Sequence, residues 1–334
     1  MRQYLNFILL ITISTSCENV LVNEEIGNDQ QQVFELLWHD FDKNYAGFTV
    51  RSIDWDSVYS TTMNTIDAGI SEDNFSNILT NILLSFKDIH VGFMSPNGVQ
   101  VVYDATNPNS VNGIASIDKY IDRLSESRVF NWGQITDENI GYIHIKTFNE
   151  GLFSDFRQID ELITQFSTTD GLIIDVRGNG GGSPASANLV ASRFIDHSFI
   201  AIKTQFRNGP DHGDFDSPLN GIIEPNGQNQ YLKPIVVLMN KSSQSAAELF
   251  ILPLEIQENI TTVGDFSAGG LGLNSYRELP NGWNYRLTTT LTSNRDGKIF
   301  EGMGIPPHEL IYITRTDSIN MIDTQLERAI EILK

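Results

Sequence analysis

Apolar side chains recur every three or four positions along the first part of the chain, a spacing that predicts helices. The apolar face of the first predicted helix consists of Val33, Phe34, Leu37, Trp38 and Phe41. A second helix is predicted over 55–63, with Asp54 before it as the N-cap residue, and a third over about 73–86. We therefore expect a small helical N-terminal domain at residues 33–92.

Beyond residue 92 the pattern changes to short apolar runs, which are typical of buried strands. Strands are predicted at 128–132, 140–145, from 172 onward, at 234–239, 261–264 and 285–293. Helical stretches separate several of them, at 153–166, 185–195 and 246–254, and a last helix is predicted over 317–334. Residues 206–230 are rich in Gly, Pro, Asn and Asp and predict a long surface loop. The alternation of strands and helices predicts an α/β core at residues 93–334, with a largely parallel sheet covered by helices.

The charge balance argues against nucleic-acid binding. The 334 residues include 22 Lys and Arg against 42 Asp and Glu, which gives a net charge of −20. Phosphate contacts need clustered Lys and Arg, and no such cluster is present in the sequence. We read the acidic excess as a means of solubility.

The N-terminus has the pattern of an export signal. Arg2 precedes an apolar run over 5–13, which is too short to span a bilayer and fits the apolar region of a signal peptide. Small residues then lead to Cys17, the single cysteine of the chain. This arrangement resembles a bacterial lipoprotein signal over residues 1–17, with Cys17 lipidated, followed by a polar tether at 18–32. A plain secretory signal and a buried apolar N-terminus are the alternatives.

A glycine-rich loop follows the strand that begins at 172. Its residues 178–182 read Gly-Asn-Gly-Gly-Gly, and Ser183 and Pro184 then open a predicted helix. Backbone N–H groups in such a loop, next to a helix N-terminus, can bind negative charge, either a phosphate or a transient oxyanion. Asp175 and Arg177 flank the start of the loop and predict a structural, buried ion pair.

Three further residues could supply nucleophilic chemistry. Ser245 follows the predicted strand at 234–239 and opens a helix, and a nucleophilic serine needs a base. His90 stands where the helical segment gives way to a strand, and Glu301 could hold that base. The glycine loop, through Gly181 and Gly182, and the N–H of Ala246 would provide oxyanion donors. Each residue also has a structural reading, because a serine at a helix start is commonly a cap.

Four motifs together resemble one family. They are Asp175-Val-Arg-Gly-Asn-Gly-Gly-Gly182, Ser243-Gln-Ser-Ala-Ala-Glu248, Gly264-Asp-Phe-Ser-Ala-Gly269 and Glu301-Gly-Met-Gly-Ile-Pro306. Their order is similar to that of the tail-specific or C-terminal processing peptidases, peptidase family S41, which includes the tricorn core protease. The resemblance extends from about residue 33 to the C-terminus. It implies an α/β core of the ClpP/crotonase type beside the helical N-terminal domain.

The resemblance also assigns roles to the candidate residues. Ser245 matches the nucleophile. Members with a Ser–Lys dyad carry a lysine where this chain has Gly270, so the resemblance is to the tricorn-like branch, in which a histidine and a glutamate match His90 and Glu301. That branch has a serine directly before its histidine, where Ile89 stands here, so Asp88 or a hydroxyl side chain would have to take its place. The stretch between His90 and the strand at 140–145 is too short for the PDZ module of many members.

The expected function is that of a membrane-anchored, extracytoplasmic serine peptidase that cleaves exported polypeptides and needs no metal or organic cofactor. The alternative is a non-catalytic ligand- or peptide-binding member of the same superfamily, similar to the vertebrate interphotoreceptor retinoid-binding protein. A crotonase-like acyl-CoA enzyme is a third reading, which the export signal disfavours because CoA is cytosolic.

Overall fold

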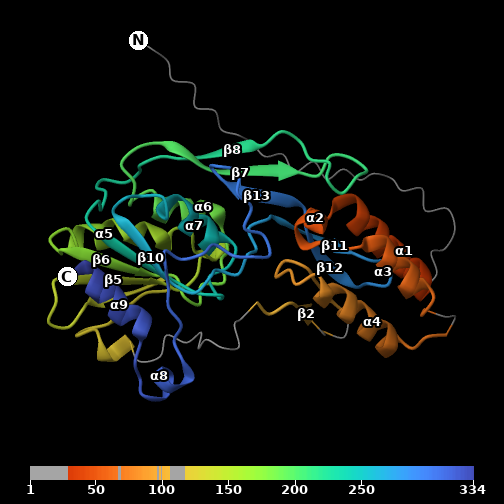
Figure 1. Cartoon of the computed structure of the whole chain (residues 1–334), viewed down its shortest axis with the longest axis horizontal. Helices are drawn as coiled ribbons and strands as arrows, with labels where there is room; N and C mark the ends of the chain where they lie inside the picture. Colours follow the sequence, from red (N-terminus) through yellow and green to blue (C-terminus); the bar gives the residue numbers. More distant parts are fainter. Residues whose placement is uncertain (1–28, 67–68, 96–97, 99, 106–116) are drawn as a thin grey trace, which may run out of the picture.

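The computed structural model describes residues 29–334, apart from 67–68, 96–97, 99 and 106–116. Figure 1 shows two lobes: a helical lobe around α1 to α4, and a core lobe around the large sheet. Cys17 and residues 18–28 of the predicted tether lie outside the described residues, and the first described helix begins at Gln30, within the last part of that tether. No helix in the described part of the chain is long and apolar enough to cross a membrane.

The helical lobe begins with four helices, of which the short second one was not predicted. They are α1 (Gln30–Asn44), the short α2 (Phe48–Arg51), α3 (Trp55–Met63) and α4 (Glu72–Ser85). The helix predicted over 55–63 is confirmed, as is its cap, because a carboxylate oxygen of Asp54 accepts from the Ser57 N–H at 3.0 Å. Capping of this kind satisfies a backbone donor that the first helical turn leaves free.

A four-stranded antiparallel sheet completes the helical lobe. Its order is β11-β12-β1-β2, with β1 at Gly92–Met94, β2 at Gln100–Val102, β11 at Asn274–Glu278 and β12 at Asn284–Thr288. Phe93, Trp283 and Tyr285 pack with the apolar faces of α1, α3 and α4 in one hydrophobic core. That core joins residues from two distant parts of the sequence, and the boundary predicted at residue 92 cuts through it.

The core lobe is built on a seven-stranded sheet of order β14-β10-β9-β6-β5-β4-β3. Strands β5 (Ile140–Ile145), β6 (Gly171–Asp175), β9 (Ile235–Met239), β10 (Ile260–Gly264) and β14 (Glu309–Leu310) run parallel, and β3 (Ser125–Glu126) and β4 (Phe130–Gln134) add an antiparallel edge. The predicted α/β class with a largely parallel sheet is therefore confirmed.

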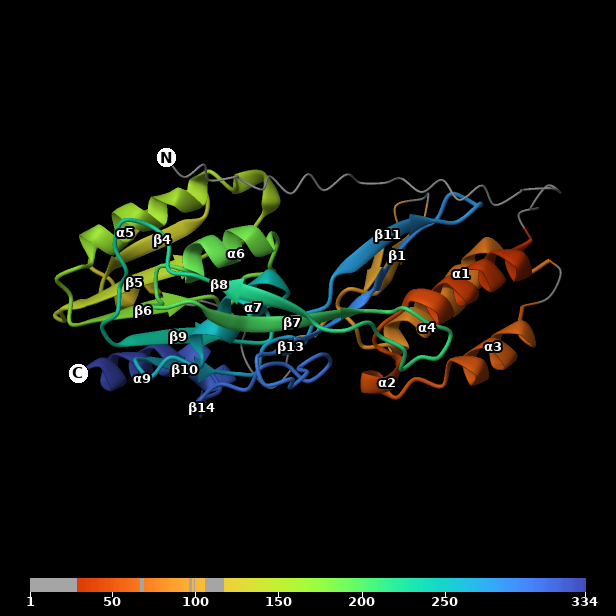
Figure 2. The ribbon, with the colours of Figure 1, turned by 90° about the horizontal axis from the view of Figure 1, so that it is seen from above.

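Helices cover both faces of this sheet (Figure 2). One face packs against α5 (Ile159–Gln165), α6 (Pro184–Ala191) and α7 (Ala246–Leu254), and the other against α9 (Thr324–Leu333). Alternate residues of β9 point to opposite faces: Val237 and Met239 pack toward α5 to α7, whereas Val236 and Leu238 pack toward α9. Burial on both faces explains why β9 is apolar without interruption.

A third sheet of order β13-β7-β8 runs from the core lobe toward the helical lobe. It consists of β7 (Phe199–Phe206), β8 (Leu219–Ile223) and β13 (Thr290–Asn294). The prediction of a loop over 206–230 is therefore wrong at β8, and the strand predicted at 285–293 is two strands, β12 and β13. Beyond β7, Arg207 donates to the carbonyl oxygens of Tyr45 and Asp42, which ties the two lobes together.

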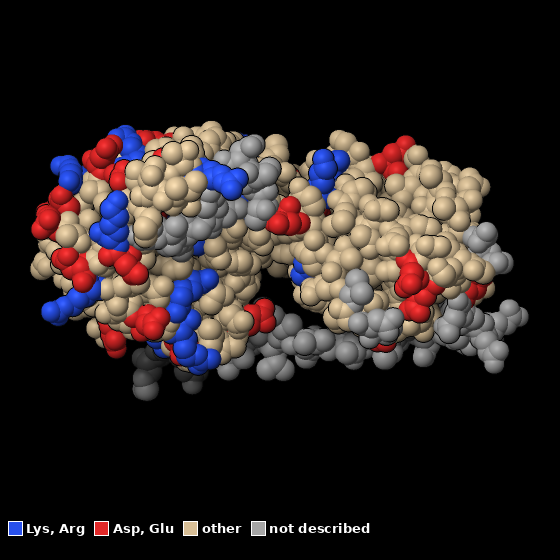
Figure 3. Space-filling view, turned by 90° about the horizontal axis from the view of Figure 1, so that it is seen from below, with Lys and Arg blue, Asp and Glu red and all other residues tan. Residues whose placement is uncertain are grey.

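The remaining elements are short. They are the 3-10 turns η1 (Ile117–Lys119), η2 (Glu150–Leu152) and η3 (Asp155–Gln158), and the helix α8 (Arg315–Ile319). On the face drawn in Figure 3, charged side chains of both signs are interspersed over the core lobe. That face therefore has no continuous basic surface of the kind that binds nucleic acid.

Candidate functional site

The site is built at the carboxyl ends of two neighbouring parallel strands. Strand β6 ends at Asp175 and leads through the glycine loop, residues 178–182, to α6. Strand β9 ends at Met239 and leads to Ser245, the N-cap residue of α7. Because β6 and β9 are paired in parallel, both loops lie at the same edge of the sheet, where α/β proteins commonly bind ligands.

Ser245 has a backbone conformation that few side-chain-bearing residues adopt. Its φ is 54° and its ψ is −117°. The carboxylate of Glu248 accepts from the Ser245 N–H at 2.9 Å, and the Ser245 carbonyl accepts from the Glu248 N–H at 2.8 Å. Strain of this kind persists only where the surroundings hold it, and it is concentrated at functional sites.

Glu248 connects the serine to the loop that follows β10. Its carboxylate is buried and accepts from four donors: the N–H groups of Ser245, Gly269 and Gly270, and the hydroxyl of Ser267. Burial raises the pKa of Glu248, while these hydrogen bonds oppose the shift. The sequence analysis noted Glu248 only as part of a motif, although a glutamate at the third position of a helix that opens with serine is a signal for such a cap.

The glycine loop lies directly against the serine. A Cβ added at Gly181 would lie 2.8 Å from the Ser245 Cβ and 2.9 Å from the Ala246 nitrogen, so only glycine fits there. The Gly181 N–H already donates to Asn179 Oδ1 at 2.9 Å. Of the three predicted oxyanion donors, the N–H groups of Gly182 and Ala246 are the two that have no acceptor among the described residues.

The base of the glycine loop is held by the ion pair predicted from the sequence. Arg177 and Asp175 are both buried, and their Nη2 and Oδ2 atoms are 2.6 Å apart. Asp323, the N-cap residue of α9, is the second carboxylate partner at 2.9 Å. The predicted pair is therefore confirmed, and it also fixes the C-terminal helix to the loop.

His90 lies next to the loop that Glu248 holds. A Cβ at Gly270 would lie 3.7 Å from His90 Cε1, and the Gly270 N–H is bonded to Glu248. The imidazole is buried; burial and the charges of Arg286 and Arg51 lower its pKa, although Asp88 and a hydrogen bond with the Gly272 backbone oppose them. Its Nδ1 has no hydrogen-bond partner within the described residues. A neutral imidazole is the form that can accept a proton.

The structure leaves no room for a lysine at position 270. A Cβ there would lie 2.5 Å from Ile89 Cδ1, and Ile89 is buried. The nearby Lys241 does not supply the missing amine, because its Nζ donates to the carbonyl oxygens of Ser267 and Met303. Ile89 therefore occupies the space that the Cβ of a side chain at position 270 would need.

Glu301 contacts the histidine's surroundings rather than its ring. One carboxylate oxygen accepts from Arg51 at 2.7 Å, and the other accepts from the N–H groups of Leu271 and Gly272 at 2.9 and 3.1 Å. In the described structure it makes no hydrogen bond with the imidazole of His90. Burial, followed by the charge of Asp88, raises the pKa of Glu301 to about 7, although Arg51 opposes the shift.

Arg51 is a functional candidate that the sequence analysis did not select, whereas Asp88 was named there only as a residue that could replace the missing serine before His90. The Oδ2 atom of Asp88 accepts from the hydroxyls of Tyr45 and Thr288 at 2.9 Å each, and lies 3.6 Å from Arg51 Nε. Its Oδ1 accepts from the backbone N–H of His90 at 2.8 Å. Burial opposes ionisation of Asp88, but Arg51 and His90 lower its pKa overall. The position of Asp88 two residues before His90 was the available signal.

The described residues contain no group of three or more His, Cys, Asp or Glu side chains that could hold a metal ion. The site is thus a serine at a helix N-terminus, the glycine loop packed against it through Gly181, and a buried histidine. A network of carboxylates and Arg51 surrounds the histidine and spans both lobes. This arrangement can support nucleophilic attack by Ser245 with stabilisation of an oxyanion.

Comparison with known proteins identifies relatives across most of the chain. The model of Peptidase family S41 matches residues 139–311, which is more than half of the chain. The carboxy-terminal processing protease CtpA of Bacillus subtilis is 27% identical over 196 residues, 58% of this chain and 40% of that protein. Tricorn protease of Thermoplasma volcanium is 29% identical over 208 residues, 59% of this chain and 18% of that protein. The chain therefore spans less than half of the length of these curated relatives.

Solved structures extend the similarity to nearly the whole fold. A candidate peptidase from Parabacteroides merdae is 30% identical, has a TM-score of 0.85, and the match covers 91% of this chain and 96% of that one. Mature CPAF is 15% identical and has a TM-score of 0.74, and the match covers 92% of this chain and 96% of that one. The second similarity is one of fold alone.

Proposed function

The chain belongs to peptidase family S41, and from this we propose that it is a serine-type peptidase that cleaves polypeptides through Ser245. The observation that carries the proposal is the strained Ser245 at the start of α7, packed against Gly181 and beside the unused N–H of Ala246. His90 is the proposed base, because its buried imidazole has a lowered pKa and is neutral near pH 7. Relatives named as carboxy-terminal processing proteases support polypeptide as the substrate class.

The proposed reaction proceeds by acyl transfer. His90 takes the proton from Ser245 Oγ as the oxygen attacks the scissile carbonyl carbon, and the N–H groups of Gly182 and Ala246 stabilise the resulting oxyanion. The protonated histidine then gives its proton to the leaving amine, and an acyl-serine remains. Water, deprotonated by His90, attacks the acyl group and releases the carboxylate product and the free serine.

Glu301, Arg51 and Asp88 are proposed as positioning residues. Glu301 binds the backbone of Leu271 and Gly272, and the Gly272 backbone in turn bonds with His90. Asp88 bonds the backbone N–H of His90, and Arg51 lies between the two carboxylates. In this arrangement Glu301 orients the base through the 271–272 segment and through Arg51.

The N-terminal sequence supports an extracytoplasmic site of action. The apolar run over 5–13 and Cys17 fit a lipoprotein signal, with the lipid on Cys17 as the membrane anchor. A peptidase anchored in this way acts on exported polypeptides.

A second candidate is a binding protein of the same fold without catalysis. The observation that favours it is the carboxylate of Glu301, whose hydrogen bonds go to Arg51 and two backbone N–H groups rather than to the histidine. Such a protein would retain ligand binding with no turnover.

Peptide hydrolysis distinguishes the two candidates. The purified protein is incubated with a library of internally quenched peptides, alongside Ser245→Ala and the control Ser242→Ala, which changes a neighbouring serine. The peptidase proposal expects cleavage by the wild type and the control, and none by Ser245→Ala. Cleavage at an unchanged rate by Ser245→Ala would refute it, and absence of cleavage by all three proteins would favour the binding protein.

A further inference from the structure

A small pocket lies on the four-stranded sheet of the helical lobe, on the face turned away from α1 to α4. Pairing across the sheet sets Tyr276, Arg286, Gly92 and Val102 in one row. Met94 belongs to the next row and is 46% exposed. Because Gly92 has no side chain, the row has a gap, and a cavity of about 90 Å³ remains between its neighbours.

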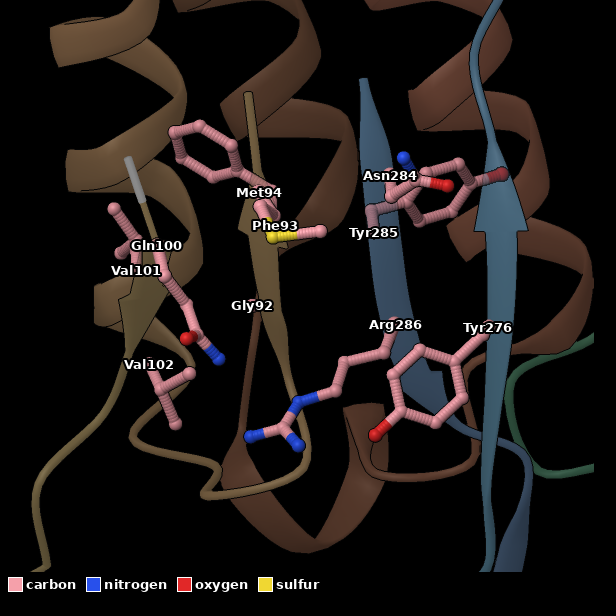
Figure 4. A pocket seen from close by; sticks show the side chains of 10 residues that line it. All are labelled: Gly92, Phe93, Met94, Gln100, Val101, Val102, Tyr276, Asn284, Tyr285 and Arg286. Atoms are coloured by element: carbon pink, nitrogen blue, oxygen red, sulfur yellow. The ribbon is translucent and has the colours of Figure 1, made fainter. Parts of the chain in front are cut away.

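Arg286 is the cation of this pocket (Figure 4). Its side chain extends from β12 toward β1, and the Tyr276 ring lies beside it. Nη2 donates to the Ile89 carbonyl at 2.7 Å. Nε is buried and has no partner among the described residues, and Nη1 has no acceptor there either.

The absence of a carboxylate partner is informative in a chain with 42 acidic residues. The buried side chains of Arg51 and Arg177 each have two carboxylate partners within 4 Å. In the part of the chain that the structure describes, Arg286 has none. A partly buried guanidinium with unused N–H groups favours an external anion, and planar carboxylates match its geometry.

The pocket adjoins the proposed base. The carbonyl that Arg286 binds belongs to Ile89, directly before His90, and Gly92 follows His90 by two residues. The positive charge of Arg286 contributes to the lowered pKa of His90. A group bound at Arg286 therefore lies close to the segment that carries His90.

We propose that this pocket binds a carboxylate of the polypeptide substrate, with Arg286 as its ionic partner and Met94, Val102 and Tyr276 as the surrounding walls. The proposal rests on the proposed peptidase function for the nature of the ligand. A carboxylate can come from an acidic side chain or from a free C-terminus, and both present the same chemistry. The volume of the cavity suits one small group, so Arg286 would act as a specificity-determining residue.

The test measures binding without turnover, in the Ser245→Ala background. Fluorescein-labelled hexapeptides of Ala and Leu form two sets. In the first set one Glu is compared with Gln at each position, with an amidated C-terminus. In the second set, which has no acidic side chain, a free C-terminal carboxylate is compared with the amide. Anisotropy titrations give the affinities.

We expect one set to bind at least about tenfold tighter in its carboxylate form, the scale of a charge-assisted hydrogen bond. Arg286→Gln should abolish that preference. Arg295→Gln, which removes the same charge from an exposed side chain, should keep it. The set that shows the preference identifies the source of the carboxylate. The proposal would be overturned if Arg286→Gln preferred carboxylate peptides as strongly as the Ser245→Ala protein does. It would also be overturned if neither peptide set showed a preference for its carboxylate form.

A second variant covers the case in which Arg286→Gln fails to fold. Val102→Glu introduces a carboxylate on the far side of Gly92 from Arg286. This carboxylate should pair with Arg286 and so remove the preference for carboxylate peptides. An unchanged preference in Val102→Glu contradicts the proposal. Because these proteins lack Ser245, the binding result does not depend on the peptidase mechanism. A preference for carboxylate peptides, found together with no hydrolysis by the wild type, would support the pocket as a binding site and contradict only the peptidase function.

Discussion

Arg51 of the helical lobe and Glu301 of the core lobe form a buried ion pair, with 2.7 Å between Nη2 and Oε1. Arg51 also lies 3.6 Å from Asp88, which bonds the backbone of His90. The proposed base is therefore held by contacts from both lobes. Removal of one partner from such a cluster leaves a buried charge uncompensated, which commonly costs several kcal/mol.

The stability of the protein should depend on Glu301 in a pH-dependent way. Its pKa is raised to about 7 in the folded state, against an ordinary glutamate value of about 4.3. Between those values the unfolded chain loses this proton while the folded protein keeps it, so stability is lost as pH rises through that range. Glu301→Gln has no titrating carboxyl group at this position, so its stability does not fall for this reason as pH rises. Relative to wild type, the free energy of unfolding of the variant should therefore increase by on the order of 3 kcal/mol between pH 4.5 and pH 7.5.

Urea unfolding followed by circular dichroism at several pH values measures this difference. Glu278→Gln, at an exposed position of β11, is the matched control and should show only a small change. A difference between Glu301→Gln and wild type that stays constant over the range would contradict the raised pKa.

The space beside His90 should not accept a side chain at position 270. In Gly270→Ala the new Cβ meets Ile89 at 2.5 Å, and overpacking of a buried site costs about 1–3 kcal/mol. Ile89→Ala introduced together with Gly270→Ala should recover part of that loss. Gly213→Ala is the control, because no atom lies within 4 Å of its added Cβ. Thermal unfolding gives the stability of wild type, Gly270→Ala, the double variant and the control. A Gly270→Ala variant as stable as wild type would contradict the prediction, because it would show that the Ile89 side chain moves aside without loss of stability.

The pH dependence of kcat/KM should identify the base. Burial lowers the pKa of His90, so the neutral imidazole forms below the ordinary histidine value of about 6.5. We expect kcat/KM to rise with pH through an apparent pKa below that value, and the rise to disappear in His90→Ala along with most of the activity. Glu301 titrates near 7, and Glu301→Gln removes its contribution while the histidine limb remains. Persistence of the limb in His90→Ala would assign the base to another group.

The sequence predicted the local features of this site because each is encoded within a few residues. The glycine loop, the serine after β9 and the alternation of strands and helices all leave short-range patterns. The buried pair of Asp175 and Arg177 was predictable for the same reason, since they are only two positions apart. Its second partner, Asp323, was not, because it comes from a helix far along the chain.

The features that were missed depend on contacts between distant segments. Arg51 lies on a four-residue helix with no periodicity, and its partner Glu301 is 250 positions away. Strand β12 joins the hydrophobic core of α1, α3 and α4 through Tyr285 and Leu287, and β11 pairs with β12, which no local pattern reveals. Strand β8 contains Gly221 and is largely exposed, so it lacks the alternation that marks a half-buried strand.

The proposed lipid anchor on Cys17 gives a separate prediction about location. When the full chain is produced in a bacterial host, the wild type should be found in the membrane fraction and Cys17→Ser should be released from it. The apolar run over 5–13 alone is too short to span the bilayer. Fractionation followed by immunoblotting measures the distribution. Retention of Cys17→Ser in the membrane would show that the apolar segment itself is the anchor.

The most direct measurement of the central claim is covalent labelling of Ser245 by a fluorophosphonate, which reacts with activated serines. Mass spectrometry of the digested protein locates the label. The account predicts a label on Ser245 in the wild type and in Ser242→Ala, none in Ser245→Ala, and strongly slowed labelling in His90→Ala. A folded wild-type protein that remains unlabelled at Ser245, or a His90→Ala variant labelled at the wild-type rate, would contradict it.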